Sequence, residues 1–389
     1  MVKKSTFFIL IIFIIGLAIR LLIATSDFSY NNDVLNAFKI VKVFNEGKNV
    51  FLSAGQYQYG YNNTPVIFYI IGILYKVGAY FSVDIPLMIN IILTFFDFFT
   101  AVVLLYLAKI KKLSSIKTVA LYFLNPISII HSSSGAQYEN AAAFFIVLAL
   151  LIYEQKKIKS YVKAISVWIV LTIGFLVEHD IALAVLTFAL HYFKPIWKAI
   201  LTFVGIFVVF LLSFFVYSPA NFLFSIKSVL SYGGIPGFYG ITSLLLFFYD
   251  ILFKPNQICL NCFSPILGTK ISNVYVVITY LFISSYLFFT LLTRYKDLGK
   301  LLLLNFLFFI SFTTGIGAYF VLPVALGSLY PSHWFYIYTF SVTLFYLGSK
   351  DFLGITIFNW VPWNIVWIPA LLWFFSEFKK VFGLKKFSP

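Results

Sequence analysis

Charged side chains are scarce in this sequence of 389 residues. Only 11% of the residues are Asp, Glu, Lys or Arg, and only 13 residues are acidic. An average soluble domain carries about 25% charged and about 45–50% apolar residues, whereas this chain is 61% hydrophobic. A soluble core cannot absorb that excess, so the composition excludes an ordinary water-soluble fold and indicates that a bilayer solvates most of the chain.

Cysteine is nearly absent, with Cys259 and Cys262 as the only two. They form a C-x-x-C motif, whereas a structural zinc site needs four ligands. Because there is no second pair of cysteines, a local disulfide, or two free thiols without a function, is a better interpretation than a metal centre. We therefore expect no required metal and no cofactor.

Long uncharged runs are plentiful. The clearest are 7–19, 199–215 and 301–310, which with their flanks reach the roughly 20 residues that a helix needs to cross hydrocarbon. The first run has no small-residue cleavage site before a polar segment, so we expect a retained helix at 5–24 and not a signal peptide. The sequence predicts an all-α, polytopic membrane protein of about 10–12 helices in one domain, 1–389.

The net charge of +15 comes from lysines in short clusters between the apolar runs. Excess Lys and Arg in short loops marks the cytoplasmic side of a membrane protein. These clusters are therefore interpreted as topology signals and not as a nucleic-acid-binding patch. The clusters that this rule places inside are 3–4, 109–117, 156–163, 194–198 and 294–300.

A polar stretch at 25–64 follows the first helix and is expected to form a large external loop. Within it, apolar residues at 34–44 recur at helical spacing, which predicts an amphipathic helix lying in the membrane interface. Gly47 is expected to end this helix. A second external region is expected at 218–270.

Two apolar stretches, 66–81 and 85–108, precede a lysine cluster that must lie inside. Two full crossings that start outside would end outside, so the charge rule and the span count disagree here. A partial or re-entrant segment at 66–81, interrupted by Gly72, Lys76 and Gly78, resolves the conflict; the alternative is a local failure of the charge rule. Further crossings are expected at 118–130, 140–153, 161–177, 181–193, 199–217, 271–292 and 301–320, with two or three segments in 334–377.

The few titratable side chains gather on the external side of this topology. Each carboxylate there stands where a helix meets an external segment, and a partly buried carboxylate can act as a general base. The group comprises Asp33, Glu139 and Asp180 with His131, His179 and His333, whereas His191 falls on the cytoplasmic side. An active site needs this kind of one-sided convergence.

Each candidate also has a structural interpretation. Asp33 can cap the amphipathic helix, and Glu139 can form a hydrogen-bonded turn with Asn140. Asp97 lies inside an apolar helix, where a carboxylate is either functional or held by a hydrogen bond between helices; we expect the hydrogen bond. His333 stands among aromatic residues and can anchor a helix at the interface.

Four local motifs, in this order, resemble those of the GT-C superfamily of polyprenyl-phosphate-sugar-dependent membrane glycosyltransferases. The first resembles the family's acidic residue, helix and "G-x-n-x-Y" segment, and the second its "Y-x-P-P" entry to the next helix. The third is similar to its "N-P … G-Q-F-D" run and the fourth to its "H-x-x-Y" helix entrance. The motifs are Asp33 with 47–51, then 61–65, then Asn125-Pro126 with 135–139, and finally 332–336.

This resemblance implies a GT-C-like helical arrangement. It also implies transfer of a hexose, mannose-like, from a polyprenyl-phosphate-sugar donor to a lipid-linked glycan or protein acceptor on the non-cytoplasmic face of the cell membrane. Asp33 is the implied catalytic base of an inverting reaction, and Glu139 with Gln137 would orient the acceptor or the base. The implied donor- or acceptor-binding residues are Glu178, His179, Asp180, Lys227, His333 and His131. Glu139 stands where Asp is commoner in the family.

Two other membrane functions fit the composition. A lipid-linked-oligosaccharide transporter or flippase predicts polar residues at mid-membrane and two similar halves, whereas the polar residues here concentrate on one side. A glycan polymerase or ligase would rely on external arginines, but the sequence has only Arg20 and Arg294, and neither is clearly in an outer loop.

Overall fold

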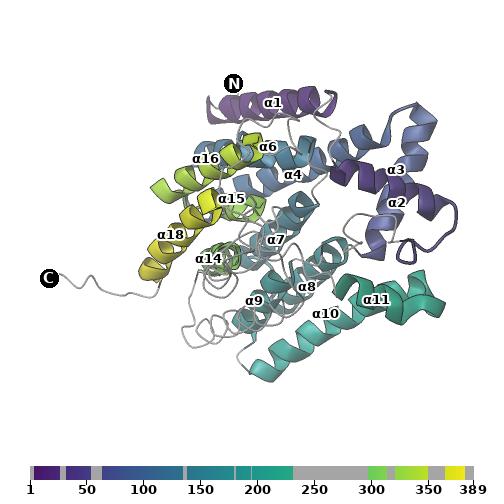
Figure 1. The fold of residues 1–389 in the computed structure, drawn as a ribbon. Helices are drawn as coiled ribbons and strands as arrows, with labels where there is room; N and C mark the ends of the chain where they lie inside the picture. The colour runs from purple at the N-terminus through teal and green to yellow at the C-terminus, as the bar shows by residue number, and fades with distance from the viewer. Residues whose placement is uncertain are drawn as a thin grey trace, which may run out of the picture. The chain divides into compact units, whose positions relative to one another are not determined.

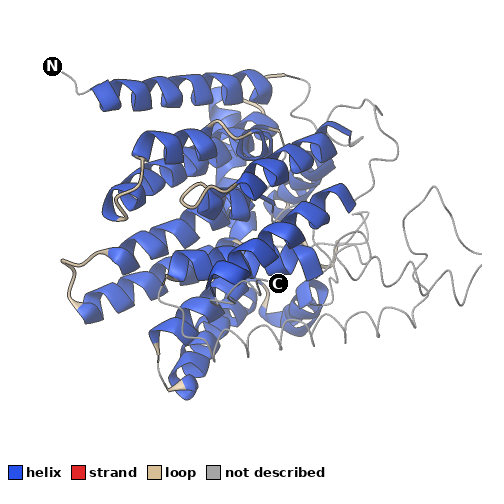
Figure 2. Cartoon of the chain, turned by 90° about the vertical axis from the view of Figure 1, so that its left-hand side faces the viewer, coloured by secondary structure: helices blue, strands red, loops and turns tan. Residues whose placement is uncertain are grey.

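The computed structural model describes residues 4–26, 32–53, 64–134, 138–178, 181–193, 195–230, 297–312, 320–348 and 364–381. Within these stretches every regular element is a helix and none is a strand (Figure 2). The all-α prediction is therefore confirmed. The chain forms two compact units, 1–232 and 233–389. The expectation of a single domain stays a prediction.

Most described helices of residues 1–232, here called unit 1, are labelled in Figure 1. They are α1 (Lys4–Ala24), α2 (Asn32–Asn45), α3 (Pro65–Phe81), α4 (Ile85–Ile110), α5 (Ser115–Phe123), α6 (Pro126–Ser133), α7 (Glu139–Glu154), α8 (Ser160–Val177), α9 (Ala182–Tyr192), α10 (Ile196–Tyr217), the 3-10 turn η4 (Pro219–Asn221) and α11 (Phe222–Leu230). The most extensive packing joins α7 to α8 and α4 to both α7 and α5, so α4 and α7 form the centre of the unit.

Several described helices of unit 1 are long and apolar enough to cross a membrane by length and composition. They are Ser5–Ala24, Ile85–Ile110, Ser160–Val177 and Ile196–Tyr217. Outward side chains on them include Ile14, which is 57% exposed, and Val216, which is 73% exposed. Such surface is stable in lipid and costly in water. All four helices coincide with predicted spans, which supports a membrane protein.

The predicted crossing at 118–130 is instead two short helices, α5 and α6, with a break at Asn125-Pro126. Proline lacks a backbone N–H and disfavours the helical conformation in the residue before it. Asn125 caps α6, because its side-chain oxygen accepts the N–H of Ile127 at 3.1 Å. Non-helical backbone at membrane depth is stable only where other protein groups satisfy it, so the carbonyl groups at the end of α5 need partners.

The amphipathic helix predicted at 34–44 is present as α2. Gly47 ends it as expected: its φ is 70°, and the next N–H, of Lys48, donates to the Val43 carbonyl at 3.2 Å, as in a Schellman cap. The apolar face of α2 packs on α3 and α4, with Val41 fully buried. Protein therefore covers Ile40 and Val41 of this face, whereas Phe38 is 46% exposed. The place of α2 in the membrane interface stays a prediction.

Helix α3 is continuous through the residues that were expected to interrupt it, and its glycines serve packing. A side chain on Gly72 would meet the Phe44 ring of α2 at 2.7 Å. A side chain on Gly78 would meet the Val83 carbonyl oxygen at 2.7 Å. Both glycines therefore lie where another segment of the same chain comes close to α3, and neither breaks the helix.

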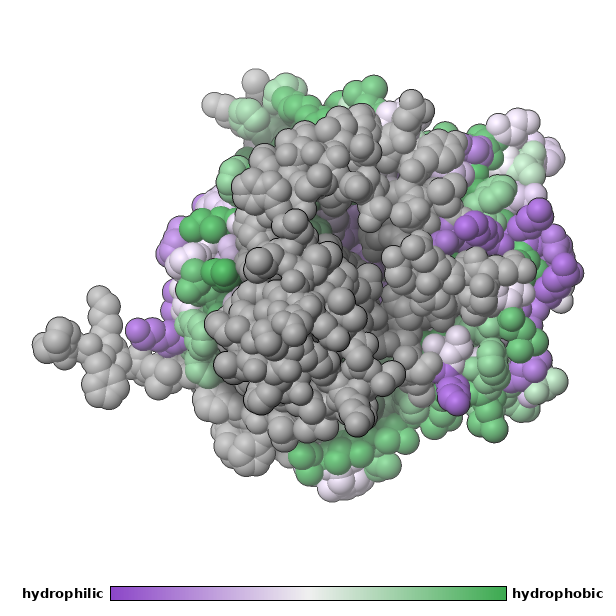
Figure 3. All heavy atoms as spheres, in the orientation of Figure 1, coloured by the Kyte–Doolittle hydropathy of each residue, from purple (hydrophilic) through white to green (hydrophobic). Residues whose placement is uncertain are grey.

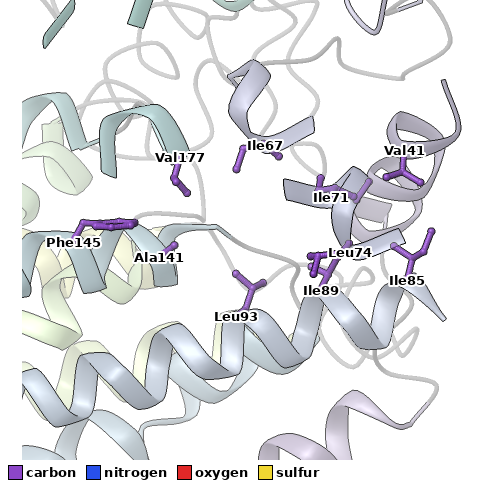
Figure 4. Packing of buried hydrophobic residues seen from close by; sticks show 11 residues of the cluster. Val41, Ile67, Ile71, Leu74, Ile85, Ile89, Leu93, Ala141, Phe145 and Val177 are labelled. Carbon is purple, nitrogen blue, oxygen red and sulfur yellow. The ribbon is translucent and has the colours of Figure 1, made fainter. Parts of the chain in front are cut away.

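Helices α3 and α4 contribute to one buried apolar cluster, which holds Ile67, Ile71 and Leu74 of α3 and Ile85, Ile89 and Leu93 of α4 (Figure 4). At a rise of about 1.5 Å per residue, Leu93 is about 12 Å from the start of α4 and about 26 Å from its end. The α4 residues that share this cluster with α3 therefore all lie in the first third of α4, and the predicted partial segment stays a prediction.

The loops after α4, α7 and α9, which the charge rule places on one side, lie at one end of unit 1. Lys111, just after α4, forms a 2.8 Å ion pair with Glu154 at the end of α7. The Tyr153 hydroxyl lies 2.8 Å from Nε2 of His191, near the end of α9. We call this the basic end of unit 1.

Residues 233–389, here called unit 2, contribute α14 (Leu298–Phe312), α15 (Val321–Gly327), α16 (His333–Gly348) and α18 (Asn364–Val381). Trp373 of α18 is fully buried against α15 and α16. Gly327 makes room for it, because a side chain there would meet the indole at 2.4 Å. The crossing expected at 271–292 and most of the external region expected at 218–270 lie outside the described residues.

The predicted crossing at 301–320 is wrong. After α14 the chain has returned by Tyr330, whose hydroxyl donates to Asp297 Oδ1 at 2.9 Å. Lys300 Nζ lies 5.4 Å from the centre of the same ring. The start of α14 and the segment before His333 therefore share one end of unit 2, whereas the charge rule puts them on opposite sides.

Gly72→Ala should lower the thermal stability of the protein, because the new methyl group would press on the Phe44 ring. Overpacking of this kind costs about 1–3 kcal/mol. Gly205→Ala in α10 is the matched control, since nothing lies within 4 Å of the added atom and alanine is favoured over glycine in a helix by about 0.5–1 kcal/mol. Thermal unfolding in detergent measures both, and equal melting temperatures would contradict the packing assignment.

Candidate functional site

The segment after α2 is fastened to the end of α10. Asn49 Nδ2 donates to the Ser218 hydroxyl at 2.8 Å, and the Val50 N–H donates to the Tyr217 hydroxyl at 2.9 Å. Phe51 is fully buried, with its ring centre 5.8 Å from that of Tyr217. This segment belongs to the first of the four motifs, which therefore clamps α2 to α10.

The beginning of α3 is fastened to the end of α8. The Thr64 hydroxyl donates to the Leu176 carbonyl oxygen, and Thr64 is fully buried. Ile67 of α3, Val177 of α8 and Ala141 of α7 belong to one buried apolar cluster (Figure 4). The starts of α3 and α7 therefore meet the end of α8.

These contacts define a second end of unit 1, which we call the motif end. It gathers the segment after α2, the starts of α3 and α7, and the ends of α8 and α10. Helix α7 begins here and finishes at the basic end, so the two ends lie on opposite sides of the unit. The sequence predicted that these segments gather on one side, and the structure confirms that they share one end of unit 1.

Two of the candidate carboxylates are buried at the motif end. Glu139 is the first residue of α7 and is 6% exposed. Glu178 directly follows α8 and is 3% exposed. The dipole of α7 favours negative charge at the position of Glu139. Because α7 and α8 pack against each other, both carboxylates lie at adjoining helix ends.

The cationic candidates among the described residues of unit 1 differ in exposure. His131 lies in α6 and is fully buried, where the neutral imidazole is favoured because burial disfavours charge. It therefore does not suit the phosphate-contacting role that the GT-C resemblance implies. Lys227 lies in the last turn of α11 and is exposed, so it is free to meet a ligand.

Asp33 is the second residue of α2. Unsatisfied N–H groups at a helix start attract negative charge, so this position suits an acidic residue in either the capping or the catalytic interpretation. The side chain of Asp33 lies outside the described residues, as do Gln137, His179 and Asp180.

His333 begins α16 in unit 2 and is exposed. Its ring centre lies 4.9 Å from that of Trp334. The pairing with an indole fits the interpretation of His333 as an interfacial anchor, and its exposure leaves the ring open to a ligand.

Arg20 of α1, which no motif singles out, forms the centre of a buried polar network. Its Nη2 lies 2.8 Å from Asp97 Oδ2 of α4, and both side chains are fully buried. The guanidinium also donates to the hydroxyls of Ser128 and Ser132 of α6, at 2.6 and 3.0 Å. The Tyr122 hydroxyl of α5 donates to the other oxygen of Asp97. Four helices therefore meet at one ion pair.

The same guanidinium satisfies the break between α5 and α6. Arg20 Nη1 donates to the Phe123 carbonyl oxygen, at the end of α5, at 2.7 Å. The guanidinium carbon lies 4.2 Å from the centre of the Phe123 ring. Gly16 lets this ring approach α1, because a side chain there would meet it at 2.5 Å. The broken helix thus has the partner for its terminal carbonyl that membrane depth requires.

The network reaches the motif end through α6. The Ser128 hydroxyl donates to Asp97 at 2.8 Å, and the Asn140 amide donates to the Ser128 carbonyl at 3.4 Å. Asn140 directly follows Glu139, so the ion pair supports the helix start that carries this carboxylate. The expected interhelical hydrogen bond of Asp97 is confirmed. Its signal in the sequence was one arginine and one aspartate, each in an otherwise uncharged helix core.

Among the described residues, no group of three or more His, Cys, Asp or Glu side chains could hold a metal ion. The C-x-x-C cysteines lie outside these residues. The chain has no match among protein-family models and none among curated proteins. The resemblance to GT-C enzymes therefore rests on the four motifs.

Arg20→Met should destabilise the protein strongly, because it leaves Asp97 buried without its partner charge. Breaking a buried pair in this way costs about 3–5 kcal/mol. Combining Arg20→Met with Asp97→Leu removes both charges and should recover part of the loss. The recovery is partial because the Phe123 carbonyl still lacks its donor.

Lys111→Met is the matched control for this prediction. Its ion pair with Glu154 is partly exposed, at 14% and 25% for the two side chains, so the loss should be at most about 1 kcal/mol. Thermal unfolding in detergent compares the variants. If Arg20→Met and Lys111→Met were equally stable, the network would not hold unit 1 together.

Proposed function

We propose that this chain is an integral membrane glycosyltransferase of the GT-C type. It transfers a hexose, mannose-like, from a polyprenyl-phosphate-sugar donor to a lipid-linked glycan or protein acceptor. The observation that carries the proposal is the convergence of three motif-bearing segments at the motif end: the segment after α2 and the starts of α3 and α7. A membrane enzyme suits a donor whose lipid tail stays in the bilayer.

In this proposal the protein is polytopic and its motif end faces the non-cytoplasmic side of the cell membrane. Support comes from the lysine clusters, because the loops that carry them close the opposite, basic end. Lysine-rich short loops stay in the cytoplasm.

Asp33 is the base of the proposed reaction. It takes the proton from the acceptor hydroxyl as that oxygen attacks the anomeric carbon with inversion, and the lipid phosphate leaves. General-base help of this kind contributes about 10²–10⁴-fold in rate. Helix α2 packs on α3 and α4 beside the motif end, which supports the assignment. Glu139, tied through Asn140 to the Arg20 network, orients the acceptor or the base together with Gln137.

The leaving phosphate needs positive charge or hydrogen-bond donors. Lys227 suits this role, because it is exposed and its helix follows the end of α10. His179 is a further candidate for the same role. His333 is a candidate on its motif alone, because its segment lies at the same end of unit 2 as Lys300. Full burial removes His131 from it. The proposed reaction requires no metal.

A lipid-linked-oligosaccharide transporter is the main rival, because transporters also place charged residues at membrane depth. The Arg20–Asp97 pair favours the enzyme over this rival. Its groups are committed to hydrogen bonds within the protein, whereas a transport path needs groups that release and rebind a substrate.

The test uses the purified full-length protein in proteoliposomes that contain a lipid-linked glycan acceptor. Radiolabelled polyprenyl-phosphate hexoses and nucleotide sugars are offered as donors. Transfer from a polyprenyl-phosphate hexose, and not from nucleotide sugars, is the expected result. Movement of labelled lipid across the bilayer without transfer would favour the transporter, and the absence of both would overturn the proposal.

Asp33→Asn should lower transfer by at least about 10²-fold, because an amide cannot accept the proton. Asp84→Asn is the matched control: Asp84 caps α4 by accepting the Leu87 N–H at 3.2 Å, and asparagine caps a helix about equally well. This control should retain full transfer, and both variants should keep the parent melting temperature. Full transfer by Asp33→Asn would sink the assignment of the base.

Lys48→Cys and Lys157→Cys should be labelled from opposite sides of the membrane, in a chain that also carries Cys259→Ser and Cys262→Ser. The Lys48 side chain is 66% exposed near the motif end, and Lys157 is exposed in the loop after α7. An impermeant maleimide should label Lys48→Cys on intact cells and reach Lys157→Cys only after permeabilisation. Any other pattern contradicts the proposed orientation.

A further inference from the structure

The outward side of α3 carries one continuous stripe of side chains, Tyr69, Ile73, Lys76 and Tyr80, here called the α3 stripe. Successive members are four, three and four residues apart, so they lie on one face of the helix. Ile73 is 62% exposed and Tyr80 is 83% exposed. Phe81, beside the end of the stripe, is 67% exposed. The opposite face of α3 packs on α4.

Most of the α3 stripe is left open by α2 and α4, the two helices that pack most closely on α3. Helix α2 approaches α3 at Gly72, and α4 covers the face that holds Ile71 and Leu74. Exposed aromatic and aliphatic surface is unfavourable in water. A lysine in the middle of the stripe is equally unfavourable deep in hydrocarbon. Tyrosine and lysine together suit the boundary between acyl chains and headgroups, where each places an apolar body in lipid and a polar tip in water.

The stripe continues a surface that suits lipid. Tyr69, at its beginning, has its ring centre 6.3 Å from that of Tyr217 at the end of α10, a helix apolar and long enough to cross a membrane. Val216, next to Tyr217, is 73% exposed. The α3 stripe therefore begins where the lipid-compatible surface of α10 ends, and it extends along a helix of 17 residues whose one charged side chain, Lys76, belongs to the stripe.

We propose that the α3 stripe docks on the phospholipid headgroup layer of the membrane that holds the protein, with Lys76 binding an anionic headgroup. Sequence analysis predicted an interfacial position for α2, but α2 buries Ile40 and Val41 in protein and leaves Lys39 and Lys42 exposed. Hydrophilic atoms gather at the right-hand edge of Figure 3, where Figure 1 draws α2 and α3. We therefore assign the interfacial position to α3 and not to α2.

Docking of α3 has a consequence for the motif end. Helix α2 contacts α3 through Phe44 and Gly72, and the segment after α2 is clamped to α10 by Asn49 and Val50. A fixed α3 therefore holds α2 and its first turn, with Asp33, at a set height above the bilayer. The α3 stripe docks on bulk phospholipid, so its docking does not depend on glycosyl transfer.

Nitroxide labels on the full-length chain test the docking. Labels at Ile73→Cys and Tyr80→Cys, with Cys259 and Cys262 changed to serine, are compared in vesicles with a lipid control at Val208→Cys and a water control at Lys42→Cys. Val208 is 46% exposed within the α10 span. Oxygen, which partitions into lipid, and a soluble nickel chelate report the surroundings of each label in power-saturation measurements.

Both stripe labels should be more accessible to oxygen than to the nickel chelate, as the label at Val208→Cys is. Their oxygen-to-nickel ratio should be lower than that of Val208→Cys, because the stripe lies at a shallower depth. A nickel preference equal to that of Lys42→Cys would overturn the docking, because the stripe would then face water. Labels that neither reagent reaches would overturn it too, because protein and not lipid would then cover the stripe. Melting temperatures near the parent value show that the exposed substitutions leave the fold intact.

Lys76→Gln tests the headgroup contact separately. In vesicles that contain phosphatidylglycerol, the label at Tyr80→Cys should show a higher oxygen-to-nickel ratio than in pure phosphatidylcholine, because an anionic surface attracts lysine. Lys76→Gln should abolish this difference, whereas Lys42→Gln on α2 should keep it. An unchanged difference in the Lys76→Gln chain would refute the assignment of Lys76.

Discussion

The Arg20–Asp97 ion pair is the contact on which the arrangement of unit 1 depends. Helix α1 turns most of its surface outward, and the residues it buries form one narrow row, Gly16, Arg20 and Ala24. Arg20 is the only one of the three whose side chain can form hydrogen bonds. A buried guanidinium is tolerated only when its partners are complete, and here a carboxylate, hydroxyls and a backbone carbonyl supply them. The requirement to satisfy this charge fixes α1 against α4, α5 and α6.

That requirement extends to the candidate site. The break at Asn125-Pro126 would leave backbone groups unsatisfied in lipid, and the Arg20 bond to the Phe123 carbonyl removes that cost. Helix α6 is then held close enough to α7 for the amide of Asn140 to reach it. The start of α7, with its buried glutamate, is thus supported by a charge located on the first helix of the chain.

The sequence predicted well wherever a local pattern decides the structure. Uncharged runs located the four long helices, because crossing hydrocarbon sets a minimum length that is visible in the chain. Gly47 was recognised as the end of α2, because a left-handed residue there has few alternatives to glycine. Glycines inside α3 were misread as interruptions. Gly72 is needed for the neighbouring ring of Phe44, and no local pattern reveals a neighbour.

The sequence by itself therefore indicated an all-helical membrane protein, and in unit 1 it correctly separated the lysine-rich loops from the motif-bearing segments. Only the tertiary structure decided what each helix faces. Arg20 and Asp97 are 77 positions apart, Val41 of α2 is buried in protein, and Tyr330 returns to Asp297. Helix length and capping depend on neighbours along the chain, whereas the pairing of buried charges and the side a helix turns to lipid depend on packing in space.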